Sequence, residues 1–244
     1  MSLHLGTSGW AYPEWRPAFY PRDLPRARYL EHYASRLTAC EINATFYQLQ
    51  SPETLAGWAA GVPEGFRFAA KAHRAVTHTA AGAASAARKG GMLGRFLESM
   101  TALGDRLGAI LVQFPPTRER EDAMLAVLLD ALRSAPPFAI EFRHESWFTP
   151  EVVGRVAGAG GTVCLADTTG EVPERLPPGP LAYVRLRADS YTEQTRAGWR
   201  DLLVREARRR PVYAFAKHKN VPAGDPFTGV GLAEWLVQGV NGRG

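Results

Sequence analysis

Eight short apolar runs are spaced along almost the whole chain, and each ends in polar or charged residues. After each run comes Gly/Pro/Ser/Thr-rich chain or a stretch with helical periodicity, an alternation that predicts parallel strands joined by crossovers. Because TIM-type barrels have about 250 residues, eight such units in 244 residues predict an α/β fold, a single (β/α)8 barrel domain over residues 1–244. The predicted strands are Leu3–Ser8, Ala39–Asn43, Phe66–Lys71, Ala109–Phe114, Phe138–His144, Thr162–Asp167, Leu181–Arg187 and Val212–His218.

Proline positions indicate where helices begin and where one is missing. Ser51-Pro52 and Thr149-Pro150 each offer an N-cap hydroxyl followed by Pro at the first helical position. The link from Gly170 to Pro180 contains four prolines and cannot hold a full helix. We therefore predict a somewhat irregular barrel with a reduced crossover between strands 6 and 7. The Ala/Gly/Ser-rich segment 75–91 predicts a long loop after the third strand.

Composition favours a cytoplasmic protein that has no membrane partner. The chain starts without a basic segment followed by an apolar one, and no apolar run approaches 18 residues. Cys40 and Cys164 fall on the second and sixth predicted strands, far apart around a barrel, so we expect two buried thiols. A net charge of +5 favours anionic partners, although a solvated arginine face also explains it.

Strand parity predicts which side chains point into the barrel. Alternate residues of a strand face opposite sides, and the apolar set should face the helices. In the fifth run, Phe138, Ile140 and Phe142 share one parity, which leaves Glu141 and Arg143 for the barrel axis. The charged residues predicted to point inward are Glu41, Glu141, Asp167, Lys71, Arg143, Arg185, Arg187 and Lys217. Three acids against five bases at the functional end of the strands predict a cup that attracts an anion.

Five short strings follow one another in a fixed order along the chain. They are Gly6-Thr7-Ser8-Gly9-Trp10, Glu41-Ile42-Asn43-Ala44-Thr45-Phe46-Tyr47, Phe68-Ala69-Ala70-Lys71 with Thr77-His78, Gln113-Phe114-Pro115-Pro116 and Glu141-Phe142-Arg143-His144-Glu145-Ser146-Trp147. Together they resemble the domain-of-unknown-function 72 (YecE-like) family. The resemblance implies a TIM-type barrel of cytosolic prokaryotic origin with no established activity. It also implies a distant similarity to the xylose-isomerase and endonuclease IV barrels, which is an analogy of fold.

The resemblance carries over a set of positions, with two departures. The matching positions are Trp10, Glu41, Asn43, Tyr47, Lys71, His78, Gln113, Glu141, Arg143, His144, Trp147 and Asp167. Arg187 stands where many relatives have His-Gly, and Ala216–Lys219 stands where many have an aromatic residue followed by Asn-Asn. The roles of Arg187 and Lys217 are therefore not carried over from the family.

The inward charges suggest an acid/base pair beside an anion site. We assign the catalytic roles to Glu141 and Asp167, two carboxyl groups on adjacent predicted strands. Nearby charged residues can give two such groups different pKa values, so that one acts as an acid and the other as a base. Lys71, Arg143 and Arg185 are predicted to hold the anion, since paired arginines suit phosphate or carboxylate groups. The other predicted substrate-binding residues are Trp10, Asn43, Tyr47, Gln113, His144, Trp147 and Lys217.

The leading hypothesis is a hydrolase or an isomerase/lyase that acts on a phosphorylated or carboxylated, sugar-like substrate. One alternative is a metal-dependent phosphodiesterase that resembles endonuclease IV, and another is a nucleic-acid or ligand-binding protein without turnover. No cofactor is predicted and no metal ligands are assigned, because the histidines form no His-x-His or His-Glu-x-x-His motif; a divalent metal remains an alternative. The inward charges could also form a purely structural ion-pair network. The sequence indicates no oligomeric state.

Overall fold

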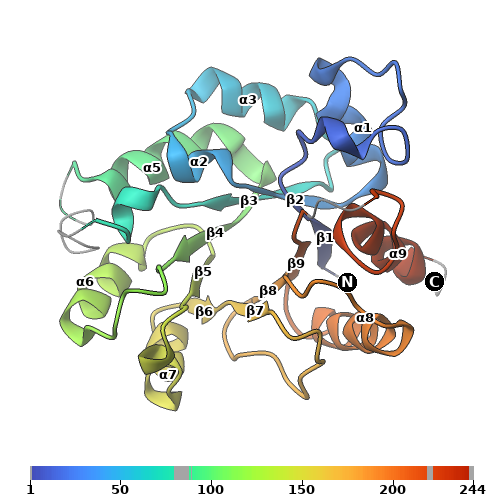
Figure 1. Ribbon diagram of the computed structural model, residues 1–244. Coiled ribbons are helices and arrows are strands. Elements are labelled where there is room, and N and C mark those ends of the chain that lie inside the picture. The colour runs from blue at the N-terminus through green and yellow to red at the C-terminus, as the bar shows by residue number, and fades with distance from the viewer. Residues whose placement is uncertain (1, 80–87, 89, 219–221, 242–244) are drawn as a thin grey trace.

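The computed structural model describes residues 2–79, 88, 90–218 and 222–241. In these ranges, nine parallel strands form one sheet in the order β6-β5-β4-β3-β2-β1-β9-β8-β7. The sheet curls into a nearly closed barrel, and the helices lie around its outer side (Figure 1). The predicted α/β fold of the TIM-barrel type is confirmed.

The strands lie close to the predicted positions. Their bounds are β1 Leu3–Ser8, β2 Ala39–Ile42, β3 Arg67–Lys71, β4 Leu107–Gln113, β5 Phe138–Glu141, β6 Gly161–Val163, β7 Leu165–Asp167, β8 Ala182–Leu186 and β9 Val212–Ala216. The fifth and eighth predicted runs extend beyond β5 and β9 into the loops that follow. The alternation of residue types continues there, and beyond the end of β9 the Lys217 amide still donates to the Leu186 carbonyl over 2.9 Å.

The sixth predicted strand is divided at Cys164 into β6 and β7. β6 pairs with β5 on one side, whereas β7 pairs with β8 on the other. The amide of Cys164 donates to the Ile140 carbonyl over 2.8 Å. Since β6 and β7 follow one another in the chain, the chain itself links the two ends of the strand order and completes the barrel.

Two of the helices, α3 and α7, begin where the predicted caps stand. The helix bounds are α1 Tyr29–Arg36, α2 Ala44–Tyr47, α3 Pro52–Ala60, α5 Met92–Met100, α6 Asp122–Leu132, α7 Pro150–Gly158, α8 Glu193–Ala207 and α9 Gly229–Asn241, with 3-10 turns η1 Pro13–Trp15, η2 Arg26–Arg28, η3 Arg74–Val76, η4 Thr101–Arg106 and η5 Glu145–Trp147. Ser51 accepts from the Thr54 amide before α3, and Thr149 accepts from the Val152 amide before α7. Both predicted helix starts are confirmed.

The crossover between β7 and β8 holds no helix, as its prolines predict. The chain runs there as a loop on the outside of the barrel (Figure 1). The predicted reduced crossover is therefore confirmed. Of the predicted long loop 75–91, residues 80–87 and 89 lie outside the described residues.

Among the described residues, two separate apolar clusters lie on the two sides of the sheet. The smaller cluster fills the barrel interior and sets small side chains of β2 to β5 against the rings of Tyr183, Tyr213 and Phe215. The larger cluster lies between the sheet and the helices and includes Phe138 and Ile140. The strand alternation in these two clusters matches the predicted parity.

Both cysteines are free and buried, as predicted. Burial raises the pKa of the Cys40 and Cys164 thiols, so neither is a thiolate at neutral pH. In the described part of the chain, no helix is long and apolar enough to cross a membrane.

Candidate functional site

The C-terminal strand ends surround a cavity of about 480 Å³, here called the cup. It is lined by Ser8, Tyr12, Asn43, Phe46, Tyr47, Lys71, His78, Gln113, Arg143, Arg185, Arg187, Lys217 and His218. Five of these residues are Lys or Arg, and none of the described lining residues is Asp or Glu. The volume is in the range of small-molecule sites, and the lining favours an anion.

An ion-pair network forms the floor of the cup. Arg185 donates through Nη1 to Glu141 Oε2 over 2.6 Å and through Nη2 to Glu41 Oε1 over 2.8 Å. Arg143 Nε donates to Glu141 Oε1 over 2.7 Å. The side chains of Arg185, Glu41 and Glu141 are at most 5% exposed. Two carboxylates therefore balance two guanidinium groups, so the ionised floor carries no net charge.

Hydroxyl groups complete the bonding of the second carboxylate. Ser8 Oγ donates to Glu41 Oε1 over 2.7 Å, and the Tyr183 hydroxyl donates to Glu41 Oε2 over 2.8 Å. Each oxygen of both floor carboxylates thus has at least one donor. This is the condition under which buried charges are tolerated, because a buried carboxylate without partners is strongly destabilising.

The floor network holds its members in their charged forms. Burial alone would raise the pKa of Glu141, but the charges of Arg185 and Arg143 outweigh it and lower that pKa below its usual value. Burial also disfavours charge on Arg185, yet Glu41 and Glu141 raise its pKa. Glu141 is therefore a carboxylate at neutral pH and has no proton to donate.

Lys71, the last residue of β3, belongs to the cup wall rather than to the floor network. Lys71 is 8% exposed, and its Nζ lies 3.7 Å from the centroid of the Phe46 ring. Burial, followed by the charge of Arg185, lowers the pKa of Lys71 to about 8. The cup therefore contains an amine that exchanges its proton near neutral pH.

Two histidines also line the wall. Burial, followed by the charge of Lys71, lowers the pKa of His78 to about 4, so this ring is neutral at pH 7. The His78 ring lies edge-on to Phe46, with 5.1 Å between the ring centroids. His218 stacks on Tyr12 at 3.9 Å, which closes the opposite part of the wall with aromatic surface.

Gln113 brings an unsatisfied polar group to the cup. It ends β4 and is 3% exposed. Its Oε1 is buried without a hydrogen-bond partner among the described residues. Because buried polar atoms are almost always paired, this oxygen is available to a donor on a bound molecule.

The structure brings together most of the predicted site residues. The predicted residues that line the cup are Asn43, Tyr47, Lys71, Gln113, Arg143, Arg185 and Lys217, with Glu141 in the floor beneath them. Four others, Asp167, His144, Trp147 and Trp10, are absent from the described lining.

Asp167 lies on the other parity of its strand. Ala166 is the register partner of inward-facing Arg185, so Asp167 pairs with Leu186 and takes the outward parity. Its carboxylate accepts from the amides of Thr169 and Gly170 and from the Tyr191 hydroxyl. The prediction that Asp167 points into the barrel is therefore wrong. Asp167 does not form an acid/base pair with Glu141 in the cup. Residues of both parities in Thr162–Asp167 are mostly apolar, so the alternation could not show which set faces the barrel axis.

His144 and Trp147 belong to the turn after β5. His144 Nδ1 accepts from the Ser146 amide, and so caps η5. Trp147 is 1% exposed, stacks on Phe142 at 4.5 Å and donates to the Arg118 carbonyl. Both side chains shape the loop and do not line the cup.

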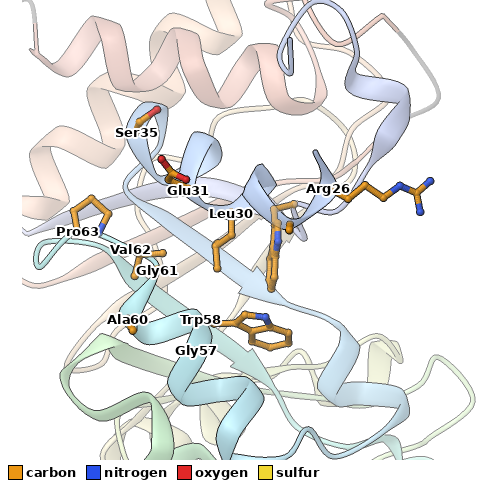
Figure 2. Close-up of a pocket in the computed structure, with 12 residues that line it drawn as sticks. Arg26, Leu30, Glu31, Ser35, Gly57, Trp58, Ala60, Gly61, Val62 and Pro63 are labelled. Carbon is orange, nitrogen blue, oxygen red and sulfur yellow. The ribbon is translucent and has the colours of Figure 1, made fainter. Parts of the chain in front are cut away.

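Trp10 lines two other cavities, and the smaller one, of about 270 Å³, shares Tyr12 and Asn43 with the cup. The other, of about 730 Å³, lies between α1 and α3 and is the larger cavity. Figure 2 shows Leu30, Trp58 and Val62 along its walls, with Arg26 directed outward. The cup is smaller, but it alone of these two joins the strand ends to buried charges, so we place the site there.

Six residues that line the cup were not among the predicted substrate-binding residues: Ser8, Tyr12, Phe46, His78, Arg187 and His218. Ser8 shares the parity of His4, whose ring stacks on Tyr213 inside the barrel, so strand parity in β1 is the signal that finds it. His218 and Tyr12 come from loops, where no such period exists. In the described part of the chain, no three His, Cys, Asp or Glu side chains form a metal-binding group.

Comparisons with known proteins agree with this architecture. The family model described as "Protein of unknown function DUF72" matches residues 4–238. UPF0759 protein YunF of Bacillus subtilis is 29% identical over 152 residues, which are 61% of this chain and 53% of YunF. UPF0759 protein YecE of Escherichia coli K12 is 29% identical over 147 residues, 60% of this chain and 50% of YecE. The chain thus spans about half the length of these curated relatives.

Two solved structures share the fold over nearly the whole chain. The crystal structure of a DUF72 family protein from Thermotoga maritima has a TM-score of 0.76, is 22% identical and covers 99% of this chain and 100% of its own. The crystal structure of a DUF72 family protein from Enterococcus faecalis has a TM-score of 0.72 and is 22% identical. It covers 99% of this chain and 98% of its own. At 22% sequence identity, the similarity to these two structures shows the fold alone.

Proposed function

We propose that this chain, which belongs to the DUF72 family of proteins of unknown function, binds and converts a small phosphorylated or carboxylated, sugar-like molecule in the cup. The observation that carries the proposal is a lining with five Lys and Arg residues and no described carboxylate, above a floor whose own charges are balanced. A bound anion compensates the positive charge of such a wall.

The anion is held by the wall cations. Arg185 is already committed, because two of its nitrogens donate to the floor carboxylates. Arg143 uses Nε for Glu141 and is 31% exposed, so its outer nitrogens face the ligand. Arg187 is half-buried, and burial followed by the charge of Arg185 lowers its pKa. Phosphate or carboxylate oxygens at Arg143 and Arg187 relieve this crowding of like charges.

The neutral part of the ligand meets a polar and aromatic wall. The unpartnered Gln113 Oε1 accepts a hydrogen bond from a hydroxyl group. Tyr47 is 70% exposed beside Phe46 and offers a ring face to the same ligand. A hydroxylated carbon skeleton with one anionic group matches both requirements.

Calorimetric titration tests this proposal with inorganic phosphate, ribose 5-phosphate and ribose. We expect ribose 5-phosphate to bind most tightly and ribose to bind weakly, with affinities that fall as salt increases. Arg187→Gln should weaken ribose 5-phosphate binding by about tenfold, because it removes a charge-assisted contact. The matched control is Arg175→Gln, which changes an arginine whose side chain is 86% exposed, in the β7–β8 loop.

Equal effects of the two arginine variants, or no phosphate binding by the wild type at low salt, would overturn the proposal. Binding of a single-stranded oligonucleotide far more tightly than ribose 5-phosphate would favour the nucleic-acid alternative instead. The metal-dependent alternative predicts that a chelator abolishes binding, whereas the cup described here binds the sugar phosphate equally well with chelator present.

A further inference from the structure

We propose that Lys71 is a nucleophilic amine that forms an imine with an aldehyde or ketone carrying an anionic group. The inference rests on the proposed anion-binding function of the cup, and it names the reactive group on the ligand. The ligand class is thus an anionic carbonyl compound, such as a phosphorylated aldose or ketose or a 2-oxo acid.

The composition of the chain points to an amine at this position. Four of the 29 Lys and Arg residues are lysines, at positions 71, 89, 217 and 219, and the other 25 are arginines. Two of these four lysines line the cup. Arginine keeps its charge in proteins, whereas lysine can lose a proton and attack an electrophile. In a chain that otherwise supplies positive charge through arginine, Lys71 offers chemistry that arginine lacks.

The local structure holds the amine at the cavity wall. Lys71 ends β3, and the Thr45 hydroxyl donates to its carbonyl oxygen over 2.7 Å. The Phe46 ring lies beneath Nζ at 3.7 Å and covers it on one side. The opposite side opens into the cup, so the amine is largely desolvated and still reachable from the cavity.

The surrounding charges favour the neutral amine. Arg185 on β8 and Arg143 after β5 oppose the ammonium form, and His78 after η3 is neutral at pH 7. Glu41 on β2 and Glu141 on β5 favour the ammonium form, but both are bound to guanidinium groups.

Burial and these neighbours place the pKa of Lys71 at about 8, so about one molecule in ten carries the neutral amine at pH 7. Desolvation beside another cation is an established way to activate a lysine nucleophile.

The reaction needs no oxidant or reductant. The Nζ lone pair attacks the carbonyl carbon, a C–N bond forms, and the carbonyl oxygen takes a proton to give a carbinolamine. The C–O bond then breaks, the nitrogen lone pair forms the C=N bond, and the oxygen leaves as water with the two protons that the amine held. Neutral His78 lines the same cavity and can relay a proton between nitrogen and oxygen.

Reductive trapping tests the proposal on the intact wild-type protein. The protein is incubated with glyoxylate and cyanoborohydride at pH 7.5, and peptide mass spectrometry locates the secondary amine. We expect Lys71 to be modified roughly tenfold faster than Lys89 or Lys219, because desolvation beside another cation activates its amine. Glycolaldehyde, an aldehyde without the anionic group, should show a weaker preference for Lys71, and added inorganic phosphate should slow modification by glyoxylate.

Variants separate this inference from the proposed function. Lys71→Arg keeps the positive charge, so it should lose the fast modification and still bind inorganic phosphate by calorimetry. Lys89→Arg is the matched control and should leave modification of Lys71 unchanged. Equal modification of all four lysines in a protein that binds phosphate would overturn the imine proposal alone. Failure of the wild type to bind phosphate would overturn the proposed function. Circular dichroism confirms that each variant is folded.

Discussion

The two carboxylates beneath the cup act first as counter-ions for buried guanidinium groups. Glu141 accepts from both Arg185 and Arg143, which fixes the direction in which Arg143 presents its outer nitrogens. With both oxygens engaged and its pKa lowered, Glu141 is a positioning residue in our proposal, and not the acid/base group. The proton-exchanging group of the cup is then Lys71.

We expect Glu141→Gln to lower the free energy of unfolding by about 3–5 kcal/mol at pH 7, because it leaves two guanidinium groups with one carboxylate between them. Urea denaturation followed by circular dichroism measures this. The matched control is Glu145→Gln, which changes an exposed carboxylate in η5 and should shift stability by less than about 0.5 kcal/mol.

The same variant carries a pH signature. Because the folded pKa of Glu141 lies below its unfolded value, ionised Glu141 contributes stability above the usual glutamate pKa of about 4.3. That contribution is lost as pH falls from there through the folded pKa. The difference in stability between wild type and Glu141→Gln should therefore shrink below about pH 4.3. A difference that stays constant down to acid pH would contradict the role as counter-ion.

At the scale of elements, strands and loops differ in what their sequences could predict. A strand has a period of two, so apolar neighbours were sufficient to direct Glu41, Lys71 and Arg185 inward. The loop after β5 has no such period, and its side chains fold back to cap η5 and to pack on Phe142. His144 and Trp147 therefore looked like site residues in the sequence, although they stabilise the loop.

The chain after β7 forms a hydrogen-bonded loop where a regular barrel would have a helix. The Asp167 carboxylate binds two loop amides and the Tyr191 hydroxyl over 2.7–3.0 Å, and so ties the loop to the segment before α8. We expect Asp167→Ala to lower the free energy of unfolding by about 2 kcal/mol, because it leaves buried donors unpaired. Thermal unfolding monitored by circular dichroism measures this loss.

The affinity of the cup for ribose 5-phosphate should change by less than about twofold in Asp167→Ala, since Asp167 does not line the cup. Glu171→Ala, an exposed carboxylate of the same loop, is the control and should match wild type in both measurements. Loss of ligand binding with unchanged stability would return Asp167 to the site.

At the scale of the whole molecule, the barrel was predictable because eight repeated units leave few other ways to bury their strands. The balance of charge inside it was not. Glu41 and Arg185 lie 144 positions apart in the chain and meet only when the barrel closes. Counting inward charges predicted a positive cup, but which cations are neutralised in the floor depends on distances across the barrel.

In the barrel interior, a large aromatic ring packs where a facing strand has a glycine and therefore no side chain. The ladder between β3 and β4 shifts register between Phe68 and Ala69, and Gly108 occupies the irregular position on β4. A Cβ at Gly108 would lie 2.6 Å from the Tyr213 ring, which is buried in the barrel interior. Glycine at this position therefore allows the tyrosine ring to occupy the axis, and the barrel closes around it.

This packing predicts opposite effects for the same substitution at two glycines. Gly108→Ala should destabilise the protein by about 1–3 kcal/mol, because the added methyl group overpacks the interior against Tyr213. Gly94→Ala, on α5 with no atom within 4 Å of the added Cβ, should stabilise it by about 0.5 kcal/mol by restricting the unfolded chain. Urea denaturation measures both. Combining Gly108→Ala with Tyr213→Leu should cost less than the sum of the single changes, because the two sites are in contact. Strict additivity, or equal stability of Gly108→Ala and wild type, would show that the ring does not require this glycine.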